Sequence, residues 1–440
     1  MPQTEPTIGD RLAALLGHLG IERCHVGGCM SGDWGGLIAA PGIDVATLTL
    51  ICPMLNEGLP DGLERLQAPT LIVTGDWGAP AARAERLSDA FANSTLITLA
   101  DYASPIWADP LADRTEEIYP AVTAVLDRSA LAHAGLSAQS GEVAGLTYDI
   151  QGAGPPLLLL PLALAPSQWQ PILERLREQF CTITVRGPML GMVALLEARG
   201  RSGYGRIVAN LTDRAALQPG EAVLEAGCGS GFLARALAER TNRANPITAT
   251  DLNRFLLDEA AALAQREGFD DVLQFQEANA EAMPFADNAY DMAYCCTVME
   301  EGDADRMLAE LVRVTKPGGR VAVMTRAVDM DWWANLDLPE ALHRKVNGLG
   351  PKTGSGAGKG GSADGGLYRR MADAGLVDIQ KFPQLAVYEE GERLDSVIVR
   401  LTSMLTGDEA AACRAAVTAA RADGTLFVAE PFHSAVGVKL

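Results

Sequence analysis

Three glycines at alternate positions, Gly227, Gly229 and Gly231, follow a short apolar segment and precede a segment rich in alanine and leucine. Glycine permits a tight turn and lets a ligand approach the backbone closely, so a strand, turn and helix in this order can hold a nucleotide-like cofactor. Glu225 lies near the end of the apolar segment. A second apolar segment ends at Asp251, twenty residues after Gly231, where a carboxylate can accept hydrogen bonds from both hydroxyls of a ribose.

The elements that must position these residues alternate as strands and helices from Ala222 to the end of the chain. A strand is predicted at Met292–Thr297, after a polar stretch that ends in the sequence AEAMPF at 280–285. The turn KPGG at 316–319 then leads into a strand at Val321–Met324. Such alternation indicates a parallel sheet covered by helices, with the strand ends along one edge.

This ordered series resembles the class I S-adenosylmethionine-dependent methyltransferases, particularly the branch that modifies quinones and natural products. That family carries E/D-x-G-x-G-x-G, an acidic residue that ends the second strand, D-A-x-x-L-P-F and a K-P-G-G turn. The resemblance covers residues 204–440 and implies a Rossmann-like, seven-stranded sheet with S-adenosyl-L-methionine (SAM) as cofactor. A nicotinamide-binding domain is the alternative, but its glycine pattern would be G-x-G-x-x-G, and the third glycine here comes one residue early. Residues 425–439 also resemble the methyltransferases' final antiparallel hairpin.

The resemblance implies a set of cofactor-binding residues. The glycines would line the methionine and ribose, Glu225 would lie near the amino end, and Asp251 would bind the ribose. Leu252 would flank the adenine, and Asn279, where the family usually has Asp, would meet the adenine edge with Ala280. The full set is Glu225, Gly227, Cys228, Gly229, Gly231, Asp251, Leu252, Asn279 and Ala280.

On the acceptor side, the resemblance places the reacting substrate atom near Thr297, at the end of the fourth strand. Glu300 and Glu301 are the candidate general bases, needed only if the acceptor is a hydroxyl or an acidic carbon. The alternative is that both glutamates cap the helix that begins near Asp303. Residues 331–333, the sequence Asp-Trp-Trp, form either an aromatic wall for a planar or cationic acceptor or part of the core. His433 is interpreted as a residue of the terminal hairpin rather than a catalyst.

The first 135 residues also alternate strands and helices. Strands are predicted at Cys24–Val26, Thr47–Ile51, Leu71–Val73 and Thr95–Thr98, with helices at Ile8–Leu19 and Ala81–Phe91. The small and polar stretch at 136–144 is predicted to be a linker. Residues 145–190 then restart a strand pattern, and a helical connection leads into the methyltransferase-like part.

Residues 25–32 resemble the nucleophile elbow of α/β-hydrolases, G-x-S-x-G, with Cys29 at the nucleophile position. Asp76 would be the triad acid, and Ala103 stands where the catalytic histidine belongs. Without an imidazole Cys29 lacks a base, so the resemblance implies a noncatalytic α/β-hydrolase-like parallel sheet. A lowered thiol pKa at a helix N-terminus leaves reactivity of Cys29 open.

Residues 145–187 resemble the opening of the same hydrolase fold, although they follow its second half. We therefore expect a circularly permuted sheet, formed either within one chain or by exchange in a homodimer. The alternative is a truncated start followed by two partial hydrolase copies.

Composition limits the class of partner. The 440 residues carry a net charge of −20, which repels nucleic-acid phosphates and anionic lipids and favours a small-molecule partner. Eight scattered cysteines form neither C-x-x-C pairs nor zinc-spaced clusters, so no metal is predicted. No signal peptide or membrane span is visible, and a cytoplasmic location is expected.

Three functions stay open at this level. The leading one is methyl transfer from SAM to a small molecule, with the hydrolase-like region serving substrate capture or dimerisation. The second is a thiol esterase fused to a methyltransferase. The third is a SAM-binding assembly module without turnover.

Overall fold

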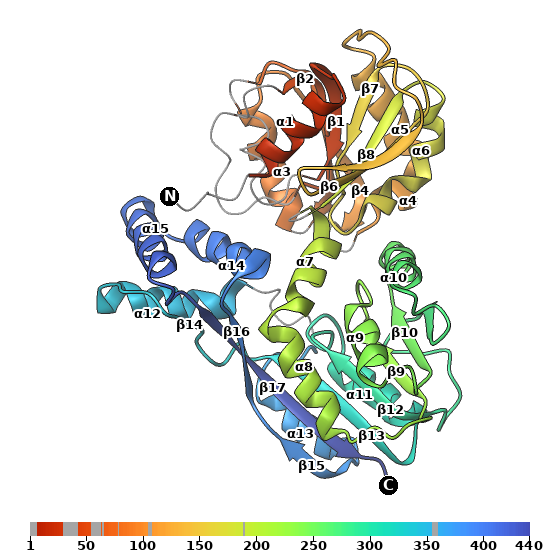
Figure 1. Cartoon of the computed structure of the whole chain (residues 1–440), viewed down its shortest axis with the longest axis vertical. Coiled ribbons are helices and arrows are strands. Elements are labelled where there is room, and N and C mark those ends of the chain that lie inside the picture. The colour runs from red at the N-terminus through yellow and green to blue at the C-terminus, as the bar shows by residue number, and fades with distance from the viewer. Residues whose placement is uncertain are drawn as a thin grey trace. The chain divides into compact units, whose positions relative to one another are not determined.

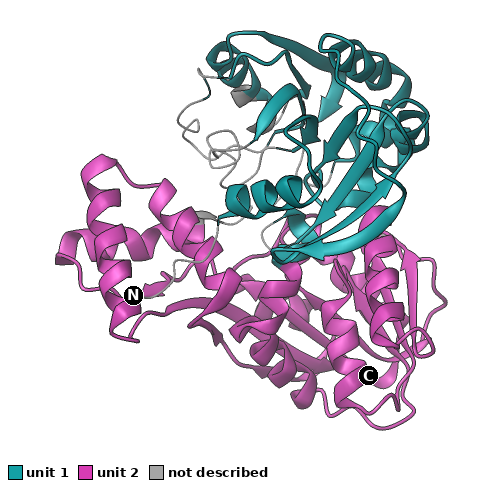
Figure 2. Cartoon of the chain, turned by 45° about the horizontal axis from the view of Figure 1, so that its top comes forward, with its two compact units in different colours: residues 1–195 teal, residues 196–440 magenta. Residues whose placement is uncertain are grey.

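The computed structural model describes residues 7–29, 43–53, 63, 66–77, 79–103, 108–187, 190–353 and 360–440. The chain divides into two compact units, residues 1–195 and residues 196–440 (Figure 2). Each unit is organised around its own sheet and is described by itself. The second unit begins before Tyr204, the start suggested by the sequence.

The described part of the first unit contains an eight-stranded sheet in the order β4-β3-β2-β1-β7-β8-β6-β5 (Figure 1). Its strands are β1 (Arg23–Gly28), β2 (Asp44–Ile51), β3 (Thr70–Trp77), β4 (Ser94–Ala103), β5 (Gln139–Val143), β6 (Leu146–Gln151), β7 (Pro156–Leu159) and β8 (Cys181–Arg186). The four strands predicted in residues 1–135 are all present.

Two expectations about this sheet were wrong. The stretch 136–144 is not simply a linker, because it includes β5, which pairs with β6 along its whole length. The sheet is also mixed rather than parallel, since β6 runs antiparallel to both β5 and β8. The small and polar residues of β5 suit an exposed edge strand, a role that its composition does not distinguish from a linker.

Strands from both predicted segments meet in the middle of the sheet. β1 pairs in parallel with β7, with His25 opposite Leu157 and Gly27 opposite Leu159. Residues 145–187 therefore complete the sheet of residues 1–135 within one chain. A partner chain is not needed for these strand pairs.

Helices cover both faces of the first sheet, because its central strands are apolar on both sides. Helix α1 and helix α3 pack on one face, and α4, α5, η2 and α6 contribute to the core on the other. Their bounds are α1 (Ile8–His18), α3 (Ala79–Ala90), α4 (Pro110–Asp113), α5 (Thr115–Leu126), η2 (Pro166–Trp169) and α6 (Gln170–Arg177). Helix α1 begins at a capping box formed by Thr7 and Asp10.

The second unit contains a nine-stranded sheet with the main order β11-β10-β9-β12-β13-β17-β14, and β15 and β16 pair with β17. Its strands are β9 (Val223–Ala226), β10 (Ile247–Asp251), β11 (Leu273–Glu277), β12 (Tyr290–Cys296), β13 (Thr315–Arg326), β14 (Trp333–Ala334), β15 (Val377–Lys381), β16 (Gln384–Tyr388) and β17 (Val428–Val438). Strands β9 to β13 are parallel, so their carboxyl ends share one edge.

The end of the sheet differs from the expected seven strands and terminal hairpin. Residues 428–438 form one continuous strand, β17, rather than two. β17 runs antiparallel to β13 on one side and to β15 and β16 on the other. The two extra strands arise because β15 and β16 share one side of the long β17, and because the two-residue β14 is added at the rim.

Helices α8, α9 and α10 pack on one face of the second sheet, and α11 and α13 pack on the other. Helices α12, α14 and α15 gather beyond the ends of β14 and β16 (Figure 1). The helices are α7 (Gly191–Arg201), which crosses the boundary between the units, α8 (Gly203–Arg214), α9 (Phe232–Arg240), α10 (Arg254–Glu267), α11 (Ala304–Val314), α12 (Glu340–Leu349), η3 (Gly350–Thr353), α13 (Gly366–Asp373), α14 (Gly391–Ser403) and α15 (Gly407–Ala422). None of the helices within the described residues is long and apolar enough to cross a membrane.

Candidate functional site

The glycine-rich turn between β9 and α9 adopts backbone conformations that favour glycine. Gly227, Gly229 and Gly231 have φ angles of 77°, 55° and 72°. A β-carbon at Gly227 would stand 2.2 Å from Cγ2 of Val298, so space as well as conformation excludes a side chain there. The tight glycine turn that the sequence predicts is thus present at the carboxyl edge of the sheet.

Asp251 joins this turn to the end of β10. Its Oδ2 accepts a hydrogen bond of 2.9 Å from the Gly229 amide, and its Oδ1 accepts one of 3.0 Å from the Asn253 amide. Burial raises the pKa of Asp251, and these backbone donors act in the opposite direction. The carboxylate is therefore held in place between two strand ends, where the resemblance positions a ribose.

Glu225 is buried in β9, with 1% of its surface exposed. Its Oε2 has no hydrogen-bond partner among the described residues. Burial raises the pKa of Glu225 to about 8, the buried Tyr294 hydroxyl beside it acts in the opposite direction, and nearby Asp251 adds to the rise. A buried carboxyl group with an unpaired oxygen can receive a cationic group, such as the amino end of SAM.

A buried ion-pair network braces the glycine turn, and the sequence analysis did not identify it. Arg235 on α9 donates from Nη2 to both carboxylate oxygens of Glu197 on α7, at 2.8 Å each. Ser230 in the turn donates to the same glutamate at 2.7 Å, and Arg235 also donates from Nη1 to the Ser230 carbonyl at 2.8 Å. The turn is thereby fixed to a helix that precedes the recognised motifs.

The residues assigned to the adenine end lie on the same edge of the sheet. Leu252 follows Asp251 and has 61% of its surface exposed, unusual for a leucine and consistent with a ligand contact. Asn279 is exposed beyond β11, and its Oδ1 already accepts a hydrogen bond of 2.8 Å from the Glu281 amide. Ala280 is half-buried beside it. An amide oxygen has two lone pairs, so one acceptor position on Asn279 stays available to an adenine amine. Cys228 is buried, and burial raises its thiol pKa well above the usual value.

Thr297 ends β12 in a conformation that β-branched residues rarely adopt, with φ of 57°. Its Oγ1 accepts a hydrogen bond of 3.2 Å from Arg199 Nη1 and lies 3.1 Å from the Tyr204 hydroxyl. The Arg199 guanidinium also stacks 3.7 Å from the centre of the Tyr204 ring. Thr297 therefore lies in a polar cluster at the carboxyl end of β12, the strand that pairs with β9. Its role beside the acceptor stays a prediction.

Glu300 and Glu301 differ from each other in setting. Glu300 is fully buried, its Oε1 accepts a hydrogen bond of 2.8 Å from the Arg326 amide, and burial raises its pKa. Glu301 is half-buried. The first turn of α11 is capped by Asp303, whose Oδ1 accepts bonds from two backbone amides, so the proposed cap does not consist of the glutamates. A role as general base stays a prediction for both.

The two tryptophans after β13 differ in exposure, and only Trp332 fits the core alternative. Trp332 is buried against Gly350, whereas 59% of the Trp333 surface is exposed. His433 lies in β17 rather than in a hairpin. Its two ring nitrogens contact the Tyr368 hydroxyl at 3.0 Å and Asp329 Oδ1 at 2.9 Å, so it is a satisfied structural histidine in this arrangement.

The first unit's elbow residues are only partly described, because 30–32 lie outside the described residues. Cys29 is 1% exposed, and its Sγ donates a hydrogen bond of 3.2 Å to the Cys52 carbonyl. Asp76 accepts bonds from the amides of Asp101 and Tyr102, so it holds the end of β4 rather than an imidazole. His25, in the strand that precedes Cys29, lies 2.9 Å from the Thr47 hydroxyl, and burial and then Arg23 lower its pKa to about 4.

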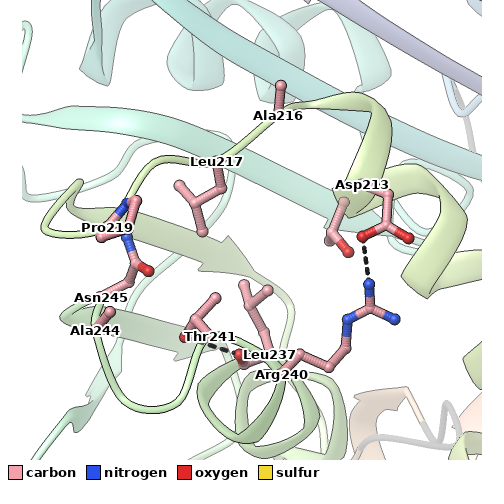
Figure 3. A pocket seen from close by; sticks show the side chains of 10 residues that line it. Asp213, Ala216, Leu217, Pro219, Leu237, Arg240, Thr241, Ala244 and Asn245 are labelled. Atoms are coloured by element: carbon pink, nitrogen blue, oxygen red, sulfur yellow. Dashed lines mark hydrogen bonds and ion pairs between the residues drawn. The ribbon is translucent and has the colours of Figure 1, made fainter.

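A shallow surface pocket of about 270 Å³ lies elsewhere on the second unit (Figure 3). It is lined by the end of α8, the end of α9 and the segments that precede β9 and β10, including Asp213, Leu217, Arg240 and Asn245. These segments lie at the amino ends of the strands, opposite the glycine turn and Asp251. We therefore do not assign the cofactor to this pocket.

Comparison with known proteins identifies a methyltransferase domain in the second unit. Residues 223–319 match a family model described as a methyltransferase domain. An uncharacterized protein of Mycobacterium tuberculosis is 36% identical over 137 residues, which are 31% of this chain and 47% of that protein. The ubiquinone/menaquinone biosynthesis C-methyltransferase UbiE of Hahella chejuensis is 30% identical over 113 residues, 26% of this chain and 45% of the relative. The match thus spans about half the length of these relatives.

Among solved structures, the YcgJ protein from Bacillus subtilis is 17% identical with a TM-score of 0.38, covering 53% of this chain and 98% of that one. The family match, together with the glycine turn, Glu225 and Asp251, shows that the second unit carries a SAM-dependent methyltransferase domain. S-adenosyl-L-methionine is its cofactor.

Proposed function

We propose that this chain transfers the methyl group of SAM to a small-molecule acceptor at the carboxyl edge of the second unit's sheet. The observation that carries the proposal is the pair of carboxylates at adjoining strand ends. Glu225 has an unpaired buried oxygen that suits the cationic amino end of SAM. Asp251 is fixed by the Gly229 amide, which leaves its outer lone pairs for the ribose hydroxyls.

When bound, SAM supplies an activated methyl group on a sulfonium, so the protein has mainly to position the acceptor in line with it. Thr297, Tyr204 and Arg199 lie together at the end of β12, next to β9 in the sheet, and are suited to hold the acceptor. Glu300 would take up a proton only if the acceptor is a hydroxyl or an acidic carbon. Burial raises the pKa of Glu300, which makes its carboxylate a stronger base than an exposed glutamate.

For the first unit we propose a noncatalytic, circularly permuted hydrolase-like scaffold. The strand order supports the permutation. Counted from β5, the strands lie in the order first, second, fourth, third, fifth, sixth, seventh and eighth across the sheet. Counted from β1, the chain starts in mid-sheet and must pass from edge strand β4 to the opposite edge strand β5, although consecutive strands are usually neighbours.

The absence of catalysis in this scaffold is supported by its residues. The thiol of Cys29 acts as a hydrogen-bond donor to a carbonyl, and Asp76 is occupied by backbone amides. A thiolate nucleophile would need a nearby base, which Ala103 does not provide. Capture of the acceptor or dimerisation is the role that we propose for this unit.

The test is transfer of label from methyl-labelled SAM to metabolites of a cell extract. The wild-type chain should label at least one small molecule, and Asp251→Ala should not. If the protein binds S-adenosyl-L-homocysteine but labels no compound in extracts of varied origin, the assembly-module alternative replaces methyl transfer. If it binds neither form of the cofactor, the proposal fails.

A further inference from the structure

Four arginines approach the end of β12 and β13 from separate elements of the second unit. They are Arg199 on α7, Arg326 at the end of β13, and Arg393 and Arg400 on α14. We call them the arginine cluster. The motifs of the methyltransferase resemblance include none of them.

Glu430 in β17 lies at the centre of this cluster. Its carboxylate accepts a hydrogen bond of 3.0 Å from Arg393 Nη2, and its Oε1 lies 4.0 Å from Arg326 Nε. Burial opposes ionisation of Glu430, but Arg393, Arg199 and Arg326 outweigh it and lower its pKa. One buried carboxylate is thus surrounded by three guanidinium groups.

The cluster contains more hydrogen-bond donors than its neighbours satisfy. Four buried guanidinium nitrogens have no partner among the described residues: Nε and Nη2 of Arg199, Nη1 of Arg326 and Nε of Arg393. Arg199 is the strongest case, because its surface is 7% exposed and it bears two of the four. Beside these four unpaired donors, one carboxylate oxygen near the cluster, Oε2 of Glu300, also lacks a partner. The unpaired donors therefore outnumber the unpaired acceptor. An unsatisfied buried donor is costly, so such an excess indicates a missing acceptor.

The electrostatics agree with this donor excess. Burial, followed by the repulsion of Arg393 and Arg326, lowers the pKa of Arg400 to about 10. Positive charge is therefore crowded around this point even with Glu430 ionised. The whole chain has a net charge of −20. A local concentration of buried arginines is therefore not a consequence of its overall composition.

The cluster also lies where an acceptor would react. Arg199 donates to Thr297 at the end of β12, and the Arg326 amide donates to Glu300 in the following loop. We propose that the arginine cluster binds an anionic group, a carboxylate or phosphate, of the methyl acceptor. The assignment of the bound anion to the methyl acceptor rests on the proposed function. Anion binding itself can be tested without turnover.

An anion has only acceptor lone pairs, and guanidinium groups match carboxylate and phosphate geometry with paired N–H donors. Binding would supply acceptors for buried guanidinium nitrogens that lack them, above all the two on Arg199. A neutral or cationic acceptor would leave these donors unpaired and would add no compensating charge.

The methionine end of SAM also carries a carboxylate, and the experiment has to separate the two sources. Inorganic phosphate is titrated calorimetrically into protein saturated with S-adenosyl-L-homocysteine. The wild type should bind one phosphate per chain, and Arg199→Gln should weaken that binding about tenfold or more, as expected for loss of charge-assisted hydrogen bonds. Arg344→Gln, at an exposed arginine on α12 that is 75% accessible, is the matched control and should leave phosphate binding unchanged.

Folding is checked by S-adenosyl-L-homocysteine binding, which Arg199→Gln should keep within about twofold of the wild type. Arg199→Lys is the second variant, because it keeps a positive charge but removes the planar fork, and it should give an intermediate phosphate affinity.

The proposal is overturned if phosphate up to about 10 mM does not bind the cofactor-saturated wild type, or if Arg199→Gln and Arg344→Gln behave alike. It is also overturned if Arg199→Gln weakens the binding of S-adenosyl-L-homocysteine and leaves phosphate binding unchanged. The cluster would then hold the cofactor. Failure of the wild type to bind the cofactor product contradicts the proposed function instead, and phosphate titration into the unliganded protein still tests the anion site.

Discussion

The carboxyl end of β9 in the second unit and that of β1 in the first unit carry polar or reactive side chains in different surroundings. At the end of β9 the turn consists of left-handed glycines, with Glu225 unpaired beneath it. At the end of β1, Cys29 is buried and donates to the Cys52 carbonyl. The first edge keeps a buried carboxyl oxygen without a partner, whereas Cys29 and Asp76 at the second edge are hydrogen-bonded to backbone groups. The buried hydroxyls of Thr49 and Thr74 in β2 and β3 also lack partners, but a hydroxyl carries no charge.

This difference teaches how to separate a site from a scaffold that resembles one. A motif shows only that a turn of a given shape can form. Unpaired buried groups cost free energy in the absence of a ligand, so they indicate that a ligand compensates for them. On this criterion the edge beside Glu225 and Arg199 is the stronger candidate for a ligand site, because a buried carboxyl oxygen and buried guanidinium nitrogens lack partners there.

The largest expected effect concerns the brace of the glycine turn. Arg235→Gln would leave Glu197 with only Arg201 and Ser230 as partners, and should lower the free energy of unfolding by about 3 kcal/mol. Arg240 lies on α9 like Arg235, but forms an exposed ion pair with Asp213 of α8. Arg240→Gln should lower the free energy of unfolding by less than about 1 kcal/mol. Urea denaturation measures both. Equal losses would mean that the brace contributes no more than a surface ion pair.

Asp251→Ala should weaken binding of S-adenosyl-L-homocysteine about hundredfold or more, because two charge-assisted hydrogen bonds to the ribose and the tie to Gly229 are lost together. Asp271→Ala is the control, since that aspartate is 61% exposed beyond α10. Titration calorimetry gives both affinities. An unchanged affinity in Asp251→Ala would remove the assignment of this edge to the cofactor.

A smaller effect is proton release on cofactor binding. Glu225 has its pKa raised to about 8 by burial, so it is mostly protonated at pH 7 in the free protein. A cationic amino group beside it favours the carboxylate, and binding should release up to about one proton at pH 7. The release should fade above about pH 8, where Glu225 is already ionised.

Calorimetry of the same titration in buffers of different ionisation enthalpy measures this proton release, and Glu225→Gln should abolish it. The raised pKa has a consequence for stability as well. The contribution of Glu225 is fully present below its ordinary pKa of 4.5 and is lost as the pH rises through about 8. Proton release that persists in Glu225→Gln would assign the proton to another group.

The smallest effect is expected at the other edge. Cys29→Ala should leave hydrolysis of chromogenic esters at the wild-type background, because the thiol lacks an imidazole. Cys413→Ala, at another buried cysteine, serves as the control for purification background. Loss of ester hydrolysis in Cys29→Ala alone would restore the thiol esterase alternative.

The sequence predicted those features that depend on residues close together in the chain. The glycine turn, the strand that ends at Asp251 and the four early strands could be recognised because spacing and periodicity are properties of short segments. The order of β1 and β7 was also expected from the resemblance of two separated segments to one fold.

The rest depends on contacts between distant residues. Arg199 lies 98 positions from Thr297 in the sequence, and Glu197 lies 38 positions from Arg235, so neither partner could be inferred from its neighbours. Both residues looked like polar positions of a connecting helix. The same reason explains why β5 resembled a linker and why β17 was divided in two, since pairing partners rather than composition determine those strands.

The account is tested most directly by hydrogen–deuterium exchange of the whole chain with and without S-adenosyl-L-homocysteine. The cofactor product should slow exchange in the turn at 227–231 and in residues 251–253, and leave exchange at 23–29 unchanged. Protection confined to the first unit, or none in the turn at 227–231 at saturating ligand, would contradict it.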